Sequence, residues 1–183
     1  MTAAVIVAAG AGTRMGGVAK ALLRCGDATF LAAIAGTARA VGLHDAVVVV
    51  AAPYGDEVAA HAEGLGLRVA WNPDPARGMS SSIAIGFSAL ADGDAAWLWP
   101  VDHPYVTTDT LAALLAAHAH HDVARPVYAG RGGHPPLIAR RVWGRFDGAI
   151  ARDVIAACDV IDVAVTDAGV VRDVDTLSDR EAS

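Results

Sequence analysis

The chain has 183 residues, 54% hydrophobic and 19% charged, which suits one domain with a substantial core. Its formal net charge of -6 gives no attraction for nucleic acid or an anionic membrane surface. No apolar stretch approaches the roughly 20 residues that span a bilayer. We therefore expect a single cytoplasmic domain over residues 1–183 that binds neither nucleic acid nor membrane.

Short runs rich in Val and Ile alternate with longer segments of helical period. This pattern is typical of an α/β fold with a mainly parallel central sheet and helices on both faces. In chain order, strands are predicted at residues 3–8, 46–51, 68–71, 95–101, 125–129 and 170–174. Helices are predicted at residues 29–41, 55–65 and 79–91, after the capping residues Thr107 and Thr108, and at 149–158. Residues 129–136, rich in Gly and Pro, indicate a loop or tight hairpin.

The first predicted strand runs into a glycine-rich loop over residues 8–20. Glycines after a strand permit positive φ and close backbone approach, so several amide N–H groups can converge on a phosphate. Arg14 and Lys20 add the cations that a triphosphate needs. Nucleotide binding is assigned here to Ala8, Ala9, Gly10, Gly12, Thr13, Arg14 and Lys20.

Three other interpretations of this loop compete with phosphate binding. A Walker loop needs Lys-Ser or Lys-Thr directly after its second glycine, where this chain has Val18. A dinucleotide-binding loop lacks its usual acid, because the second strand ends in Ala51 and Ala52. A purely structural turn would need neither Arg14 nor Lys20. Phosphate binding is therefore favoured.

A candidate metal ligand follows the apolar strand at residues 95–101, in the segment Asp102-His103-Pro104. Ligands of open α/β sheets bind at the carboxyl ends of strands, so Asp102 is expected near the first loop, holding Mg²⁺ against phosphate oxygens. A lone Asp there is more often a turn or helix cap, and the glycine loop reverses that preference. Asp175 is the preferred second ligand, with Asp173 and a solvated acidic strand end as alternatives.

Two further segments carry candidate contacts. Ser80, Ser81 and Ser82 open a predicted helix, where free N–H groups and hydroxyls favour nucleotide contact over ordinary N-capping. A second glycine loop, residues 130–136, gives close backbone approach, while Arg131 and His134 offer polar contacts to an acceptor. Acceptor binding is assigned to His103, Gly133, His134 and Pro135.

Together these segments resemble the molybdenum cofactor guanylyl- and cytidylyltransferase-like family of nucleotidyltransferases. The resemblance covers nearly the whole chain in order, and residues 8–16 with Lys20 are its most specific part. It implies a three-layer Rossmann-like fold, Mg²⁺ dependence and a metal ligand at Asp102. Ala8-Ala9-Gly10 is similar to the cytidylyl branch, which implies CTP, although cytidylyltransferases commonly have Gln in place of His103.

The implied reaction is transfer of a nucleoside monophosphate, CMP from CTP first, to a phosphorylated acceptor with release of pyrophosphate. Molybdopterin or the molybdenum cofactor is the expected acceptor, and a molybdoenzyme or its chaperone is a candidate protein partner. Arg14, Lys20 and Asp102 are the predicted catalytic residues. Three alternatives stay open: a sugar phosphate or other small acceptor, a non-catalytic protein that delivers a cofactor, and a nicotinamide-dependent oxidoreductase.

Overall fold

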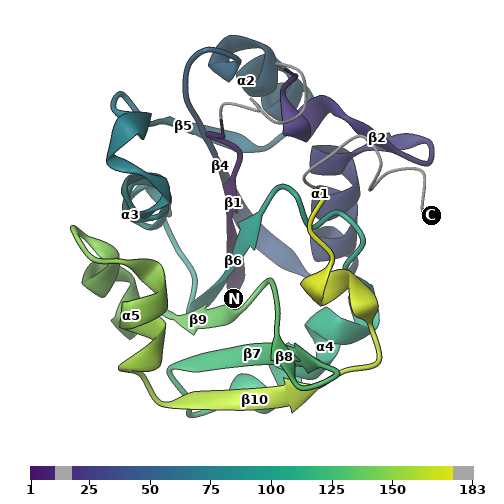
Figure 1. Ribbon diagram of the computed structural model, residues 1–183, viewed down its shortest axis with the longest axis vertical. Coiled ribbons are helices and arrows are strands. Elements are labelled where there is room, and N and C mark those ends of the chain that lie inside the picture. The colour runs from purple at the N-terminus through teal and green to yellow at the C-terminus, as the bar shows by residue number, and fades with distance from the viewer. Residues whose placement is uncertain (11–17, 175–183) are drawn as a thin grey trace.

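A computed structural model describes residues 1–10 and 18–174. Its centre is an eight-stranded sheet with the order β10-β7-β9-β6-β1-β4-β5, in which β8 pairs with β7 (Figure 1). Only β8 and β9 run antiparallel to their neighbours, so the prediction of a mainly parallel sheet is confirmed. The strands are β1 (Thr2–Val7), β4 (Leu43–Val50), β5 (Arg68–Trp71), β6 (Ala95–Pro100), β7 (Val123–Tyr128), β8 (Arg131–Gly132), β9 (Leu137–Ala139) and β10 (Val160–Ala164).

The central parts of strands β1, β4 and β6 are apolar because helices cover both faces of the sheet. All six residues of β6 are buried, as are the last five residues of β4 and of β1. Successive side chains of β1 alternate between the faces: Ala4 and Ile6 join one core cluster, whereas Val5 and Val7 join the other. The sheet therefore separates two cores.

Helices from different parts of the chain fill the two outer layers, as Figure 1 shows with α3 and α5 on one side and α1 and α4 on the other. This confirms the predicted three-layer architecture. One layer contains α1 (Phe30–Ala40), α2 (Gly55–Gly64) and α4 (Thr108–His118). The other contains α3 (Met79–Ala89), the 3-10 helix η4 (Arg140–Phe146) and α5 (Ala151–Ala156).

Local sequence explains several helix boundaries. Thr29 caps α1 by accepting a hydrogen bond from the N–H of Ala32 at 3.1 Å, and Thr107 caps α4 as predicted. Gly86 lets α3 lie directly on the sheet, because a Cβ at this position would overlap Val5 and come within 2.9 Å of Val49. In the described part of the chain, no helix combines the length and apolarity needed to cross a bilayer.

The predicted hairpin at residues 129–136 is confirmed, because β7 turns into β8 through Ala129 and Gly130, which have φ values of 48° and 76°. Two successive positive φ angles are typical of the tight turns that match strand twist. Sequence reasoning missed the last sheet strand, β10, and the small hairpin of β2 (Arg24–Cys25) and β3 (Ala28–Thr29). It also missed β9.

The predicted strand at residues 170–174 is wrong. The segment instead forms the 3-10 helix η5 (Ala168–Val171), started by Asp167, whose side chain accepts a hydrogen bond from the N–H of Gly169 at 2.8 Å. The edge strand β10 lies before this segment, and sequence reasoning missed it because Asp162 interrupts its apolar run. That carboxylate is paired with Arg125 of β7, at 2.8 Å between Nε and Oδ1, so it suits the edge of the sheet.

Candidate functional site

The segments that follow β1 and β6 remain side by side beyond the strands. The N–H of Val101 donates to the carbonyl of Val7 at 3.1 Å, and the N–H of Ala8 donates to the carbonyl of Val49 at 2.9 Å. The chain moves from β1 to β4 on one side of the sheet and reaches β6 on the other. Such a switch point opens a crevice at the carboxyl ends of the strands, where ligands of α/β sheets bind.

Lys20 and Asp102 meet at this edge of the sheet. Lys20 begins the 3-10 helix η2 (Lys20–Leu22), and its Nζ lies 3.5 Å from Oδ2 of Asp102. The two side chains are only 18% and 24% exposed. Partial burial reduces solvent screening, so the charges act strongly on each other and on any bound anion. Lys20 is also the only lysine in the sequence.

The backbone holds Asp102 in place on both sides. Its carbonyl accepts a hydrogen bond from the N–H of Val174 at 3.0 Å. The next residue, His103, donates its N–H to the carbonyl of Pro100 at 3.2 Å and accepts from the indole of Trp99 at 3.0 Å. Trp99 is fully buried in β6, so the position of the carboxylate is tied to the sheet core.

The second carboxylate oxygen of Asp102 has no hydrogen-bond partner among the described residues, although it is buried. A buried oxygen without a donor is costly unless another group binds it, and carboxylate oxygens are ligands that Mg²⁺ prefers. Residues 1–10 and 18–174 contain no cluster of three or more His, Cys, Asp or Glu side chains that would hold a metal unaided. Asp175, the other predicted ligand, lies outside the described residues, and Asp173 is exposed.

Two imidazoles lie beside the carboxylate. His103 and His134 have ring centroids 4.8 Å apart, and Nε2 of His103 is 3.8 Å from Oδ1 of Asp102. Burial lowers the pKa of His134 to about 4; charge on His103 acts in the same direction, and Asp102 opposes it. His134 is therefore neutral near pH 7. The structure thus brings together two of the predicted acceptor residues.

The loop that carries His134 rests on η5. The N–H of His134 donates to the carbonyl of Val170 at 2.7 Å, and a Cβ on Gly133 would overlap that same carbonyl. Only glycine permits this approach without a backbone shift. Pro135 follows in the same loop. The segment whose secondary structure was predicted wrongly therefore supports a predicted acceptor loop.

One hollow, here called the glycine pocket, has a volume of about 410 Å³. Of the residues assigned to the nucleotide, Ala9, Gly10 and Ser82 line it, whereas Gly12, Thr13 and Arg14 lie outside the described residues. Ala8 lies between the lining residues Val7 and Ala9 in the sequence. The pocket is lined by Val7, Ala9, Gly10, Ala52, Pro75, Ala76, Gly78, Met79 and Ser82.

The three serines do not share one site. Ser82 is buried, and Ser80 and Ser81 line a separate hollow of about 190 Å³. Sequence reasoning missed Asn72, whose side-chain amide donates to Oγ of Ser82 at 2.8 Å and to Oγ of Ser81 at 2.9 Å. Its position directly after the strand at residues 68–71 was the signal available in the sequence.

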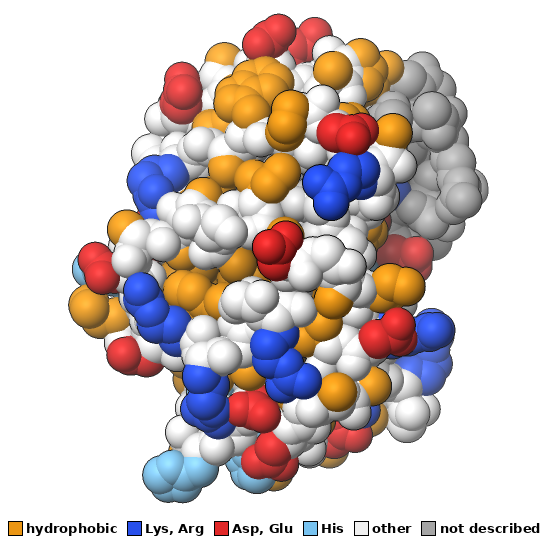
Figure 2. Space-filling model, turned by 90° about the vertical axis from the view of Figure 1, so that its left-hand side faces the viewer, with side chains coloured by type: hydrophobic (Ala, Val, Ile, Leu, Met, Phe, Trp, Pro, Cys, Tyr) orange, Lys and Arg blue, Asp and Glu red, His pale blue; other side chains and the backbone are white. Residues whose placement is uncertain are grey.

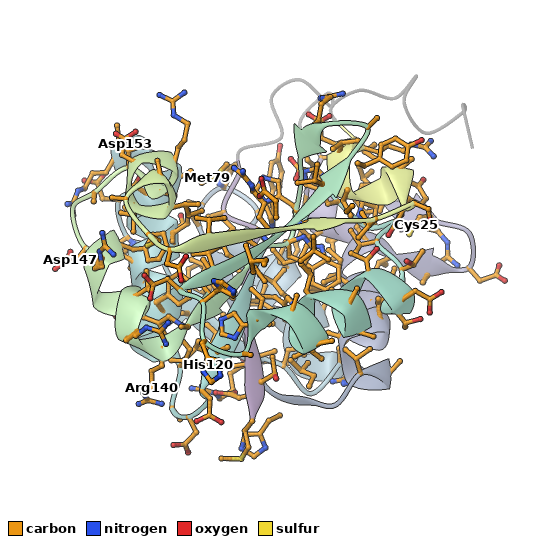
Figure 3. All side chains as sticks on the ribbon, turned by 90° about the horizontal axis from the view of Figure 1, so that it is seen from below. Cys25, Met79, His120, Arg140, Asp147 and Asp153 are labelled. Carbon is orange, nitrogen blue, oxygen red and sulfur yellow. The ribbon has the colours of Figure 1, made fainter. Side chains whose placement is uncertain are left out.

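A further hollow, here called the arginine cleft, has a volume of about 830 Å³. Figure 2 shows hydrophobic side chains gathered among Lys and Arg side chains on the face that carries α3 and α5. Met79 and Asp153, labelled in Figure 3, lie on this same side. The cleft is lined by Val7, Met79, Ile83, Leu98, Pro100, Arg125, Gly132, Gly133, His134, Pro136, Ala151, Arg152, Ile155, Ala156, Cys158 and Val160.

Two curated relatives share about a third of their aligned residues with this chain. A protein of Rubrobacter xylanophilus named "Bifunctional IPC transferase and DIPP synthase" is 37% identical over 136 residues, which are 70% of this chain and 30% of that protein. The chain thus spans less than a third of that relative's length. A protein of Paenarthrobacter nicotinovorans named "Nicotine blue oxidoreductase" is 32% identical over 73% of this chain and 69% of its own.

Solved structures show the same fold over the whole chain. The homologue of Mycobacterium tuberculosis Rv0371c from Mycobacterium sp. strain JC1 matches with a TM-score of 0.83 and 30% identity, over 99% of this chain and 93% of its own. The manganese complex of Rv0371c from M. tuberculosis has a TM-score of 0.76 at 24% identity, over 99% and 96% of the two chains.

The glycine loop, the strand-end carboxylate and the three-layer fold agree with one protein family. Residues 4–163 match the family model described as "MobA-like NTP transferase domain". This match spans most of the 183 residues and includes Lys20, Asp102 and His134. The chain therefore belongs to the MobA-like NTP transferase family.

Proposed function

We propose that this protein transfers a nucleotidyl group, CMP from CTP first, to a phosphorylated acceptor and releases pyrophosphate. The observation that carries the proposal is the pairing of Lys20 with Asp102, 3.5 Å apart at the carboxyl edge of the sheet. Membership of an NTP transferase family supports the reaction class. The name of the Rubrobacter relative also includes a transferase activity.

The side chains and backbone would act mainly by positioning and by neutralising charge. An oxygen of the acceptor phosphate attacks the α-phosphorus of the NTP in line, the bond from that phosphorus to the bridging oxygen breaks, and pyrophosphate leaves. Amides around Gly10 hold the triphosphate, and Lys20 offsets the charge that moves to the leaving group. Arg14, Gly12 and Thr13 keep their nucleotide-binding roles as predictions from the sequence.

Asp102 would hold Mg²⁺, because its Oδ1 is buried and has no donor among the described residues. A bound Mg²⁺ would polarise phosphate oxygens and spread the negative charge of the reacting groups. Asp175, which directly follows Val174 in the sequence, stays the proposed second ligand. A protein with the same fold has been solved as a manganese complex, which supports a divalent cation as the bound metal.

The acceptor would lie against His103, Gly133, His134 and Pro135. A phosphate monoester carries about two negative charges near neutral pH, so it needs no general base to become nucleophilic. This agrees with a His134 that is buried, neutral and of low pKa. Molybdopterin is the first candidate because of the resemblance in sequence, and a molybdoenzyme or its chaperone remains the candidate protein partner.

Oxidoreductase activity is the second candidate, because the Paenarthrobacter relative carries that name. A nicotinamide dinucleotide normally places its ribose hydroxyls on an acid after the second strand of the fold. Here β4 is followed by Ala51 and Ala52, and Ala52 lines the glycine pocket. No carboxylate lines that pocket in the described part of the chain. The geometry therefore favours nucleotidyl transfer.

Pyrophosphate release tests the proposal. The purified protein is incubated with Mg²⁺ and each NTP in turn, with and without molybdopterin, and Asp102→Asn is the control. We expect release that requires CTP, molybdopterin and Asp102. NTP binding without release for any acceptor would instead support a delivery protein, and turnover of NADH or NADPH without metal would support an oxidoreductase.

A further inference from the structure

The arginine cleft combines an apolar wall with cationic side chains. Its wall is apolar, with Ile83 from α3, Leu98 from β6, Pro136 before β9 and Ile155 from α5. Its charged lining residues are Arg125 and Arg152, and no carboxylate lines it within the described residues. Both guanidinium groups are paired with carboxylates outside the lining, so the cleft offers an apolar wall with guanidinium groups on which a ring can stack.

The two arginines are held differently. Arg125 binds both carboxylate oxygens of Asp162, at 2.8 and 3.0 Å, and its guanidinium lies against Gly132, where a Cβ would come within 3.1 Å of it. Among the described residues, Arg152 pairs only with the adjacent Asp153, at 3.8 Å between Nε and Oδ1, and its side chain is 92% exposed. Arg152 is therefore the cation able to turn and cover a ligand in the cleft.

The cleft joins the proposed reaction centre at two places. Val7 and Met79 line both the arginine cleft and the glycine pocket. Gly133 and His134 line the cleft, and the His134 ring lies 4.8 Å from that of His103, next to Asp102. An acceptor with its phosphate near Asp102 would therefore have its body against the wall of the cleft.

We infer that the arginine cleft selects acceptors that combine a phosphate monoester with a flat, largely apolar ring system, and that Arg152 covers the ring. This inference rests on the proposed function, because it places the acceptor of that reaction. The volume of about 830 Å³ falls in the upper part of the range of small-molecule pockets, so the cleft has room for a ligand with a sizeable body. A compact sugar phosphate would leave most of the apolar wall in contact with water, whereas a ring buries it and stacks on a guanidinium.

Equilibrium binding to the full chain, without nucleotide or turnover, tests the inference. The probes are 2-naphthyl phosphate, which has a ring, and glycerol 3-phosphate, which is compact and polar; isothermal titration calorimetry gives both affinities. We expect naphthyl phosphate to bind about tenfold more tightly or better, from burial of its ring. Equal binding of the two probes, or tighter binding of glycerol 3-phosphate, overturns the inference.

Matched variants locate the binding. Ala156 lines the cleft, and Ala157, the next residue, does not; both are exposed. Ala156→Trp should fill the cleft and lower naphthyl phosphate affinity by about tenfold or more, while Ala157→Trp leaves it unchanged. Arg152→Ala should lower it by about threefold, with Arg141→Ala, outside the cleft, as the charge control. An Ala156→Trp variant that binds the probe like wild type overturns the inference.

The two proposals fail in different experiments. Selective binding of naphthyl phosphate that is lost in Ala156→Trp supports the cleft assignment even where no NTP yields pyrophosphate, and in that case only the proposed reaction is wrong. Pyrophosphate release with a compact phosphate acceptor, together with equal binding of the two probes, supports the reaction and overturns the ring selectivity.

Discussion

The glycine pocket and the arginine cleft adjoin at Val7 and Met79, yet they are built from different parts of the chain. The pocket is lined by small residues of the loops that follow β1 and β4 and precede α3. The cleft is lined mainly by larger side chains from α3, α5 and the strands β1, β6, β7 and β10. A pocket of backbone and small side chains suits groups shared by all NTPs, whereas a wall of apolar and cationic side chains suits one particular acceptor.

We therefore expect the glycine pocket to bind groups that all NTPs share and the arginine cleft to select the acceptor. Changes at the carboxyl edge between the hollows should reduce turnover with every acceptor, because the triphosphate is common to them all. Changes in the arginine cleft should alter the choice of acceptor with less effect on the chemical step. The following experiments act on the edge, then on the wall of the cleft, and then on the glycine pocket.

Lys20→Ala should have the largest effect, a loss of about 100-fold in kcat, or about 3 kcal/mol of transition-state stabilisation. The reason is that the ammonium lies 3.5 Å from Asp102 at the proposed site of charge transfer. Pyrophosphate release measures kcat, and thermal unfolding verifies the fold. Since Lys20 is the only lysine, acylation followed by peptide mapping also reports whether an NTP protects it.

Turnover close to wild type in Lys20→Ala would remove this residue from the catalytic role. Lys20→Arg is the matched variant, because it keeps the charge and changes the geometry. Partial activity in this variant, with the same choice of acceptor as wild type, would place the effect at the edge rather than in the arginine cleft.

Sequence reasoning located the edge but not the cleft. Lys20 and Asp102 were predictable because parallel strands place their carboxyl ends together, so a loop after one strand and an acid after another must lie close. Arg125 and Arg152 follow no motif, and they line one cleft because α5 packs over the part of the sheet that contains β7 and β10. Such pairing depends on tertiary contacts that the periodicity of a single segment does not contain.

The error at residues 170–174 has a similar cause. The apolar pair Val170 and Val171 has the composition of a strand, and both β-branched residues favour extended structure. The capping hydrogen bond from Gly169 to Asp167 and the bond from His134 to the carbonyl of Val170 instead hold a helical turn. Tertiary partners outweighed the strand propensity of this segment. Asn72 was missed for a related reason, because its two serine partners are nine and ten residues away.

His134 gives a pH test of the wall of the cleft. Its pKa is lowered by burial from 6.5 to about 4 in the folded protein. Between these values the unfolded chain binds a proton that the folded chain does not, so stability falls as the pH drops from 6.5 toward 4 and is retained above 6.5. The full effect is about 3 kcal/mol, to be measured by urea unfolding of the metal-free protein at several pH values.

His134→Gln should reduce the slope of stability against pH in this window, because the group that takes up the proton in the unfolded chain is gone. His120→Gln, a change at an exposed histidine, is the control and should leave the slope as it is in wild type. Equal slopes of unfolding free energy against pH for wild type and His134→Gln would show that His134 is not held neutral. The wall of the cleft would then be more accessible to water than the burial of His134 implies.

Ser82→Ala should have the smallest effect and tests whether the glycine pocket uses a side chain as well as backbone. Oγ of Ser82 accepts a hydrogen bond from Asn72 at 2.8 Å, and Asn72 keeps Ser81 as a second acceptor in the variant. The expected loss is about 1 kcal/mol of stability, from urea unfolding, and about fivefold in NTP affinity, from calorimetry. Ser80→Ala, in the separate hollow, is the control for both. A loss of stability with unchanged NTP affinity would make Ser82 a support for Asn72 alone, and the pocket would then hold the nucleotide through its backbone.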